Sequence, residues 1–176
     1  MKAPYLTQAQ LTAMLTYDET SGDFTWKVRS DARPQWNGRY AGKRAGYVRE
    51  ATGGGLYISI RIFDWPFAAH RLAWLYMTGK WPKEMIDHKN GDGTDNCWSN
   101  LREASRSQNG ANASLSKRNA SGLKGVSVCK KTGRFRATIG LSGRQKWLGT
   151  FDCPQEAHAA YMNAAKARSA EFARAK

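Results

Sequence analysis

Four side chains with the chemistry to hydrolyse a phosphodiester lie within residues 87–109. Asp87 and His88 are adjacent, Asn100 follows the histidine by twelve positions, and Asn109 lies nine positions further on. Imidazole titrates near neutrality, so His88 is expected to take a proton from an attacking water. The side-chain oxygen of Asn100 is expected to accept from the other ring nitrogen and so fix the ring. Asp87 and Asn109 offer hard oxygen ligands for one divalent metal ion, with Mg²⁺ expected and Mn²⁺ as the alternative.

A hairpin followed by a helix is predicted to position these groups. Residues 85–88 fit a short strand, the run after it is dense in turn-forming residues, and residues 100–104 fit a second strand. From Ser105 the pattern S-x-x-Q is typical of a capping box, which predicts a helix beginning near Arg106. Asn109 would then face back toward the hairpin. Strict alternation sends the Asp-His pair to opposite faces of a strand, so the hairpin must twist or end there for both to reach one phosphate.

Neighbouring polar side chains leave alternatives open. Asn96 is a rival to Asn100 as the partner of the catalytic histidine, although its simpler role is in the turn. Asp92 and Asp95 could assist a metal, but a turn so rich in Gly and Asn favours a structural role for them. His70 is expected to pack or to contact a phosphate rather than to catalyse.

The segments before this motif are predicted to form alternating helices and strands. Apolar spacing indicates a helix over 7–17, and alternation indicates strands near 24–28 and over 56–63, the second of them ended by Pro66. A helix is predicted over 68–77. Trp residues in and after it are expected to belong to the core rather than to stack on bases; they are Trp74, Trp81 and Trp98.

Charge is distributed unevenly along the chain. The net charge is +14, and residues 102–176 contain 15 Lys and Arg against 4 Asp and Glu, whereas residues 1–101 contain 13 against 10. Such a basic C-terminal part predicts a nucleic-acid partner. Apolar content collapses between residues 110 and 121, which indicates a linker. Lys117, Arg118 and Asn119 within it could follow the minor groove as an extended basic arm, or could simply be a flexible, solvated linker.

The stretch carrying the four chemical side chains resembles the HNH nuclease family, in the homing-endonuclease variant whose third residue is Asn. The runs HRLAW and NLREASRSQN are similar to its phage and intron-encoded branch. The resemblance covers roughly residues 65–112. It implies a ββα-metal (His-Me finger) fold with Asp87 and Asn109 on metal, His88 as base and Asn100 as its orienting residue.

The runs GVSV, GRFRATI and KWLGTFDCPQEAHAAYMNAA are similar to the plant ethylene-response-factor (Apetala-type) DNA-binding domain, which also occurs in phage endonucleases. That resemblance implies a three-stranded antiparallel sheet plus a helix, with the sheet in the major groove. Ser127, Cys129, Thr138 and Gly140 depart from residues common in plant members, so DNA docking is implied but plant-like base readout is not. The residues predicted to contact DNA are Lys117, Arg118, Lys124, Lys130, Lys131, Arg134, Arg136, Arg144, Lys146 and Trp147.

These patterns predict an α+β chain with four parts. Residues 1–64 would support the nuclease, 65–112 form the HNH nuclease core, 113–122 form a basic linker, and 123–176 form the Apetala-type DNA-binding domain. The three cysteines show no CxxC pair, so neither a disulfide framework nor a zinc ribbon is indicated. With no apolar signal core and no run near 18 apolar residues, the protein is expected in the cytoplasm of a host bacterium or phage-infected cell.

The predicted function is a metal-dependent endonuclease on double-stranded DNA that leaves 5′-phosphate and 3′-OH ends. A site-directed homing or phage nuclease is expected, nicking one strand as a monomer, with a dimer left open and no small-molecule cofactor or membrane partner. The alternative is a DNA-binding regulator with a vestigial nuclease unit. A nonspecific bacteriocin-like toxin is disfavoured, because a dedicated DNA-reading domain would have no use there.

Overall fold

The chain forms two compact units. A computed structural model describes residues 5–51, 54–112, 115, 119–141 and 144–169. The first unit is Met1–Glu103 and the second is Ala104–Lys176. Both combine short helices with small antiparallel sheets, as predicted for an α+β chain. The predicted linker contacts Lys117 and Arg118 lie outside the described residues. Within the described ranges, every helix is too short or too polar to span a lipid bilayer.

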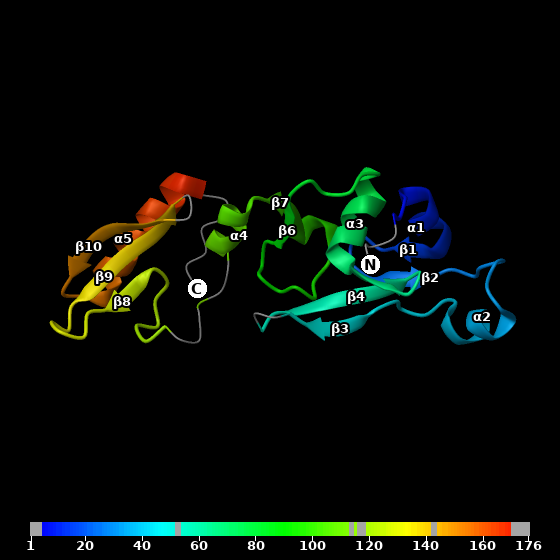
Figure 1. The fold of residues 1–176 in the computed structure, drawn as a ribbon, viewed down its shortest axis with the longest axis horizontal. Helices are drawn as coiled ribbons and strands as arrows, with labels where there is room; N and C mark the ends of the chain where they lie inside the picture. The colour runs from blue at the N-terminus through cyan, green and yellow to red at the C-terminus, as the bar shows by residue number, and fades with distance from the viewer. Residues whose placement is uncertain (1–4, 52–53, 113–114, 116–118, 142–143, 170–176) are drawn as a thin grey trace. The chain divides into compact units, whose positions relative to one another are not determined.

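The first unit contains three small sheets: β1-β2 and β3-β4-β5, both antiparallel, and β6-β7. Figure 1 shows these elements in order along the ribbon. They are α1 (Gln8–Met14), β1 (Leu15–Tyr17), β2 (Phe24–Trp26), α2 (Pro34–Tyr40), β3 (Tyr47–Glu50), β4 (Leu56–Ile62), β5 (Trp65–Ala68), α3 (Ala69–Thr78), β6 (Met85–His88), a 3-10 turn (Trp98–Asn100) and β7 (Leu101–Ala104).

The first predicted helix is shorter than its apolar spacing suggested. A capping box between Thr7 and Gln10 starts α1, and Leu11 turns into the core. The prediction of a helix to residue 17 was wrong, because residues 15–17 form β1 and pair with β2. Leu15 is fully buried from this strand, so the apolar spacing is satisfied without a further helical turn.

Strand β4 agrees with its prediction, but the role assigned to Pro66 was wrong. The strand ends at a tight turn whose residues Phe63 and Asp64 both have positive φ. Pro66 lies inside β5, opposite Arg61. It is tolerated there because β5 is an edge strand, where a residue without an N–H need not break the sheet.

The core of the first unit holds β6 and the turn that follows it against α3. Leu72 and Leu75 of α3 are buried together with Ile60 of β4 and Ile86 of β6. The rings of Trp74 and Trp98 lie 5.2 Å apart and join α3 to the 3-10 turn. The three Trp residues predicted as core, Trp74, Trp81 and Trp98, are partly buried and pack against this cluster.

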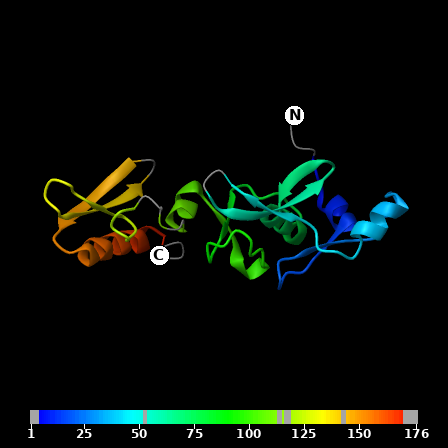
Figure 2. The same cartoon turned by 90° about the horizontal axis from the view of Figure 1, so that it is seen from below.

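The second unit is a three-stranded antiparallel sheet in the order β10-β9-β8, with one long helix on it. Its elements are α4 (Arg106–Asn112), β8 (Val126–Val128), β9 (Phe135–Leu141), β10 (Arg144–Phe151) and α5 (Pro154–Ser169). The predicted three strands and final helix are all present. Figure 2 shows α5 along one face of the sheet, where Ala137 and Ile139 pack against Ala157 and Tyr161.

Candidate active site

Strand β6 carries Asp87 and His88 at its C-terminal end, as predicted. The two residues are 4% and 5% exposed. The chain turns immediately afterwards, because the His88 carbonyl accepts from the Gly91 N–H at 2.8 Å. The Lys89 N–H donates to the Asn100 carbonyl at 2.9 Å, which holds the two strands of the hairpin together. The Asp-His pair is therefore buried at the point where the strand ends.

Asp87 forms a buried ion pair with Arg102. The Nε and Nη2 atoms of Arg102 both lie 2.9 Å from Asp87 Oδ2. The two side chains are 5% and 10% exposed, so this is an interior pair rather than a surface one. Arg102 lies on β7, the strand paired with β6. Such burial is costly for either charge alone, so each side chain depends on the other.

The turn after β6 is closed by its own acidic side chains. Asp92 Oδ1 accepts from the N–H and hydroxyl of Thr94 at 2.9 and 2.7 Å. Asp95 accepts from the Asn90 amide at 2.7 Å and from the Cys97 N–H at 3.2 Å. The hydrogen bond from Thr94 holds the pKa of the Asp92 carboxyl below its usual range. The hydrogen bond from Cys97 does the same for the pKa of the Asp95 carboxyl. The structure thus gives these carboxylates the structural role that the turn composition favoured.

The hydrogen-bond partner expected for His88 requires a correction. Asn96, not Asn100, contacts the ring: Asn96 Oδ1 lies 3.2 Å from His88 Nε2. The Asn100 carboxamide is occupied by the turn instead, accepting from the Asn90 N–H and donating to Asn90 Oδ1 and the Asp95 carbonyl. Asn100 therefore braces the turn that presents Asn96 to the histidine. Alternation and spacing alone could not distinguish the two carboxamides, because the choice depends on how the turn folds.

We expect Asn100→Ala to lower the free energy of unfolding by about 1–3 kcal/mol, because the part-buried hydrogen bonds of the Asn100 carboxamide to Asn90 and Asp95 are lost. Nuclease activity should fall as well, since Asn96 loses its support. Urea unfolding followed by Trp fluorescence, together with a plasmid-nicking assay, measures both effects. The matched control is Ser99→Ala, which changes an adjacent exposed side chain and should alter neither quantity. Unchanged stability in Asn100→Ala would contradict the bracing role.

Two aromatic side chains from other elements pack around the His88 ring. His70 of α3 lies edge-on to it with ring centroids 5.1 Å apart, and Tyr57 of β4 lies at 6.0 Å. Burial, with smaller contributions from His88 and Arg71, lowers the pKa of His70 to about 3, so this ring is neutral at pH 7. His70 thus packs beside the site, one of the two roles expected for it.

Burial also lowers the pKa of His88 itself. A hydrogen bond from the ring to Asn96 Oδ1 and the nearby Asp87 carboxylate act in the opposite direction but do not reverse the shift. The ring is consequently neutral at pH 7, which is the form that can accept a proton. Tyr57, His70 and Arg102 were not identified from the sequence as parts of this site. The pairing of β6 with β7 could have suggested Arg102 as a neighbour of Asp87. Nothing in the sequence near Asp87 and His88 indicates Tyr57 or His70.

The fourth predicted side chain, Asn109, lies on α4. The capping box predicted at Ser105 is present, with the Ser105 N–H donating to Gln108 Oε1 at 2.8 Å and the Gln108 N–H donating to Ser105 Oγ at 3.3 Å. Asn109 follows in the first turns of the helix. Because α4 belongs to the second unit, a pairing of Asn109 with Asp87 around a metal ion is a proposal. Among the described residues, no group of three or more His, Cys, Asp or Glu side chains could hold a metal.

The predicted DNA contacts of the second unit differ in their surroundings. On β9, Arg136 and Thr138 alternate with buried Ala137 and Ile139, so they lie on the face opposite α5. Trp147 pairs with Thr138 and is 63% exposed on that same face. The other contacts are placed as follows: Lys130 and Lys131 are exposed between β8 and β9, and Arg144 and Lys146 are exposed on the edge strand β10.

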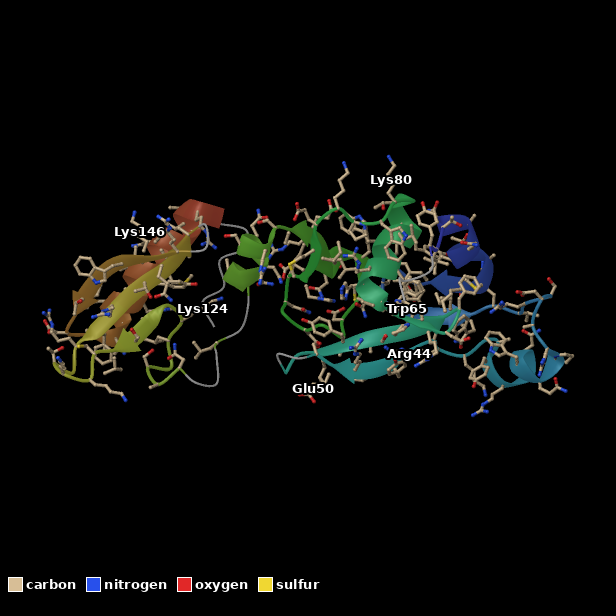
Figure 3. The ribbon with its side chains drawn as sticks, viewed as in Figure 1. Arg44, Glu50, Trp65, Lys80, Lys124 and Lys146 are labelled. Atoms are coloured by element: carbon tan, nitrogen blue, oxygen red, sulfur yellow. The ribbon has the colours of Figure 1, made fainter. Side chains whose placement is uncertain are left out.

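Two of these predicted contacts are already engaged within the unit. Lys124 Nζ donates to the Ala111 carbonyl, and Arg134 forms an exposed ion pair with Asp152 at 2.6 Å. Figure 3 labels Lys124, which precedes β8, and Lys146 on β10. The face formed by Arg136, Thr138 and Trp147 is therefore more accessible to a polyanion than Lys124 and Arg134, which already have partners within the unit.

The segment built around β6 and β7 matches a known family. The family model described as HNH endonuclease matches residues 67–111, from the end of β5 to α4. An HNH endonuclease domain is thereby identified in this segment, as the sequence pattern predicted. The match does not extend to the sheet of the second unit, so an Apetala-type domain there stays a prediction.

A phage protein shows a further similarity. Protein 3.8 of Escherichia phage T7 is 36% identical over 77 residues, which is 43% of this chain and 64% of the phage protein. The aligned region thus spans less than two thirds of that relative. No solved structure matches the chain.

Proposed function

We propose that this protein is a metal-dependent HNH endonuclease that hydrolyses phosphodiester bonds of double-stranded DNA. The observation that carries the proposal is the coincidence of the family match at residues 67–111 with a buried Asp87-His88 pair at the end of β6. The net charge of +14 supports a polyanionic substrate. The expected products carry a 5′-phosphate and a 3′-OH.

His88 acts as the general base in this proposal. The Asn96 amide nitrogen donates to the Thr94 carbonyl at 3.2 Å, which turns Asn96 Oδ1 toward the His88 ring. A carbonyl oxygen only accepts, so His88 Nε2 carries the ring proton and Nδ1 carries the lone pair. Nδ1 is therefore the atom that takes a proton from the attacking water. Packing by His70 and Tyr57 limits the orientations of the ring.

Asp87 and Asn109 are the proposed ligands of one divalent ion, Mg²⁺ in the first instance and Mn²⁺ as the alternative. A carboxylate and a carboxamide oxygen suit such hard cations, whose remaining positions water and phosphate can fill. The contact of Arg102 with Asp87 Oδ2 is compatible with this, because a carboxylate has two oxygens and about four lone-pair sites. When bound, the ion would stabilise charge on the phosphate and on the departing 3′ oxygen.

The second unit is proposed to bind the duplex and direct the cut. Its exposed Arg136 and Trp147 lie on the sheet face that α5 leaves uncovered, and exposed lysines flank the sheet. Arginine and tryptophan at such a face suit contacts to bases and phosphates. One nuclease site in each chain predicts a nick rather than a double-strand break by a monomer. Similarity to a phage protein supports a phage or homing nuclease.

Incubation of supercoiled plasmid with the protein tests the proposal. We expect conversion to open circles in Mg²⁺, loss of this conversion in EDTA, and recovery when Mg²⁺ is returned in excess. DNA ligase should reseal the nicked product, because ligation needs a 5′-phosphate beside a 3′-OH. Cleavage that persists in EDTA would contradict the metal requirement, and DNA binding without any cleavage would favour the DNA-binding regulator.

A further inference from the structure

An aromatic recess lies in the first unit, away from the hairpin that carries Asp87 and His88. It has a volume of about 610 Å³ and is bounded by β2, α2, the start of β3 and the turn after β4. We call it the aromatic recess and define it by Trp26, Arg29, Trp36, Tyr40, Tyr47 and Phe63, with Arg61 beside them. Its lining includes no residue of the proposed active site.

Three rings of the recess are exposed, whereas Trp26 is partly buried against the core. Trp36 packs against Trp26 and Tyr40 with ring centroids 5.3 and 5.2 Å apart. Tyr40, Tyr47 and Phe63 are 37%, 46% and 52% exposed. Helix α2 buries none of its own residues, so burial of an apolar face does not explain its aromatic side chains. Exposed rings around one concave site are typical of a surface that binds a flat ligand.

Phe63 is placed in the recess at a conformational cost. It occupies the first position of a two-residue hairpin turn, with φ of 51°, and Asp64 follows with φ of 59°. Asn and Gly are the residues that favour this geometry, whereas a bulky aromatic is disfavoured at positive φ. A half-exposed phenyl ring gains little from burial at this site. The strained placement is better explained by a contact that the ring makes with a ligand.

The charge around the recess indicates an anionic ligand. Residues 26–64 contain 8 Lys and Arg against 3 Asp and Glu, a net +5, although residues 1–101 together have only +3. The Arg29 guanidinium lies 5.2 Å from the Trp36 ring centroid and is ion-paired with Asp31 at 2.6 Å, so it supports the aromatic wall and its charge is already balanced. The exposed Arg61 also lines the recess, together with Asp64. Arg44, labelled in Figure 3, follows α2 and is paired with Asp23 at 2.6 Å.

We propose that the aromatic recess binds unpaired bases of single-stranded DNA, an inference that rests on the proposed DNA substrate. Aromatic rings stack on the faces of bases, and those faces are hidden in a duplex but accessible in a single strand. The exposed Arg61 would contact a phosphate of the same strand. The chain would thereby hold an unpaired segment at a site separate from the one that cuts and separate from the sheet of the second unit.

Binding of labelled oligothymidine, measured by fluorescence anisotropy in EDTA, tests this inference. The test variants are Tyr47→Leu, which keeps bulk but removes the ring, and Phe63→Asn. Each should weaken binding of the single strand by about tenfold. Annealing the oligonucleotide to its complement should make the same variants differ from wild type by less than about twofold. The matched control Tyr5→Leu removes a ring that is 80% exposed outside the recess, and should change neither affinity.

Phe63→Asn also separates a binding role from a packing role. Because Asn suits positive φ, this variant should melt about 2 °C higher than wild type while binding the single strand less tightly. Wild-type affinity of both variants for the single strand would overturn the inference, and so would an equal loss on the duplex. Failure of plasmid nicking in Mg²⁺, with single-strand binding affected as expected, would instead overturn the nuclease proposal alone.

Discussion

Replacing His88 with Ala should reduce the rate of plasmid nicking by about 10²- to 10⁴-fold, the range that a positioned general base contributes. His88 is 5% exposed at the end of β6, and its Nε2 is engaged by Asn96. In the proposed mechanism the neutral ring therefore takes up the proton at Nδ1. Affinity for DNA, measured in EDTA, should stay close to that of wild type, because the phosphate-binding charge of the chain lies elsewhere.

A second substitution distinguishes loss of the base from loss of packing. His88→Gln keeps much of the buried volume and one hydrogen-bonding group, but a carboxamide does not accept a proton at neutral pH. We expect His88→Gln to be as inactive as His88→Ala while unfolding closer to wild type in urea. The control His158→Ala removes a histidine of α5 in the second unit and should leave the nicking rate within about threefold of wild type. Substantial activity in His88→Gln would contradict the role of His88 as base.

The sequence predicted the parts of the fold that bury an apolar face. Helix α3, strand β4 and the sheet and helix of the second unit follow periodic apolar positions, and the structure contains all of them. Helix α2 and strand β3 were not predicted, because α2 has no buried residue and every residue of β3 is exposed. Because these segments bury no apolar face, their sequences lack the periodic apolar positions from which a helix or strand is predicted.

The parts of the site whose residues lie close together in the sequence could be predicted. Adjacent positions placed Asp87 and His88 on one short strand, and the capping box at Ser105 correctly placed the start of α4. The choice of Asn96 over Asn100 as partner of the ring follows from hydrogen bonds within the turn, which spacing does not encode. The side chains that pack on His88 come from β4 and α3, more than fifteen positions away, so only the tertiary fold brings them together.

Replacing Arg102 with Ala should lower the free energy of unfolding by about 3–5 kcal/mol, because it leaves the Asp87 carboxylate buried without its counter-charge. Asp87 is 5% exposed in this pair, so solvent cannot replace the guanidinium. Urea unfolding monitored by Trp fluorescence of the first unit measures the loss. Removing both charges in Asp87→Asn/Arg102→Met should recover much of it, since no unpaired charge then remains.

An exposed ion pair of the same unit provides the control. Arg44 Nη2 lies 2.6 Å from Asp23 Oδ1, but Arg44 is 61% exposed, so Arg44→Ala should cost less than about 1 kcal/mol. Equal losses in Arg44→Ala and Arg102→Ala would show that burial does not strengthen the dependence of Asp87 on Arg102, contrary to this prediction.

The Arg102→Ala variant also tests Asp87 as a metal ligand. A divalent ion could neutralise the carboxylate in place of the guanidinium, and a ligand that binds only the folded state stabilises it. We therefore expect Mg²⁺ to raise the melting temperature of Arg102→Ala more than that of wild type. Asp87→Asn removes the charge that attracts the ion and should show the smallest response. An identical Mg²⁺ response in Arg102→Ala and Asp87→Asn would contradict the proposal that Asp87 holds the cation.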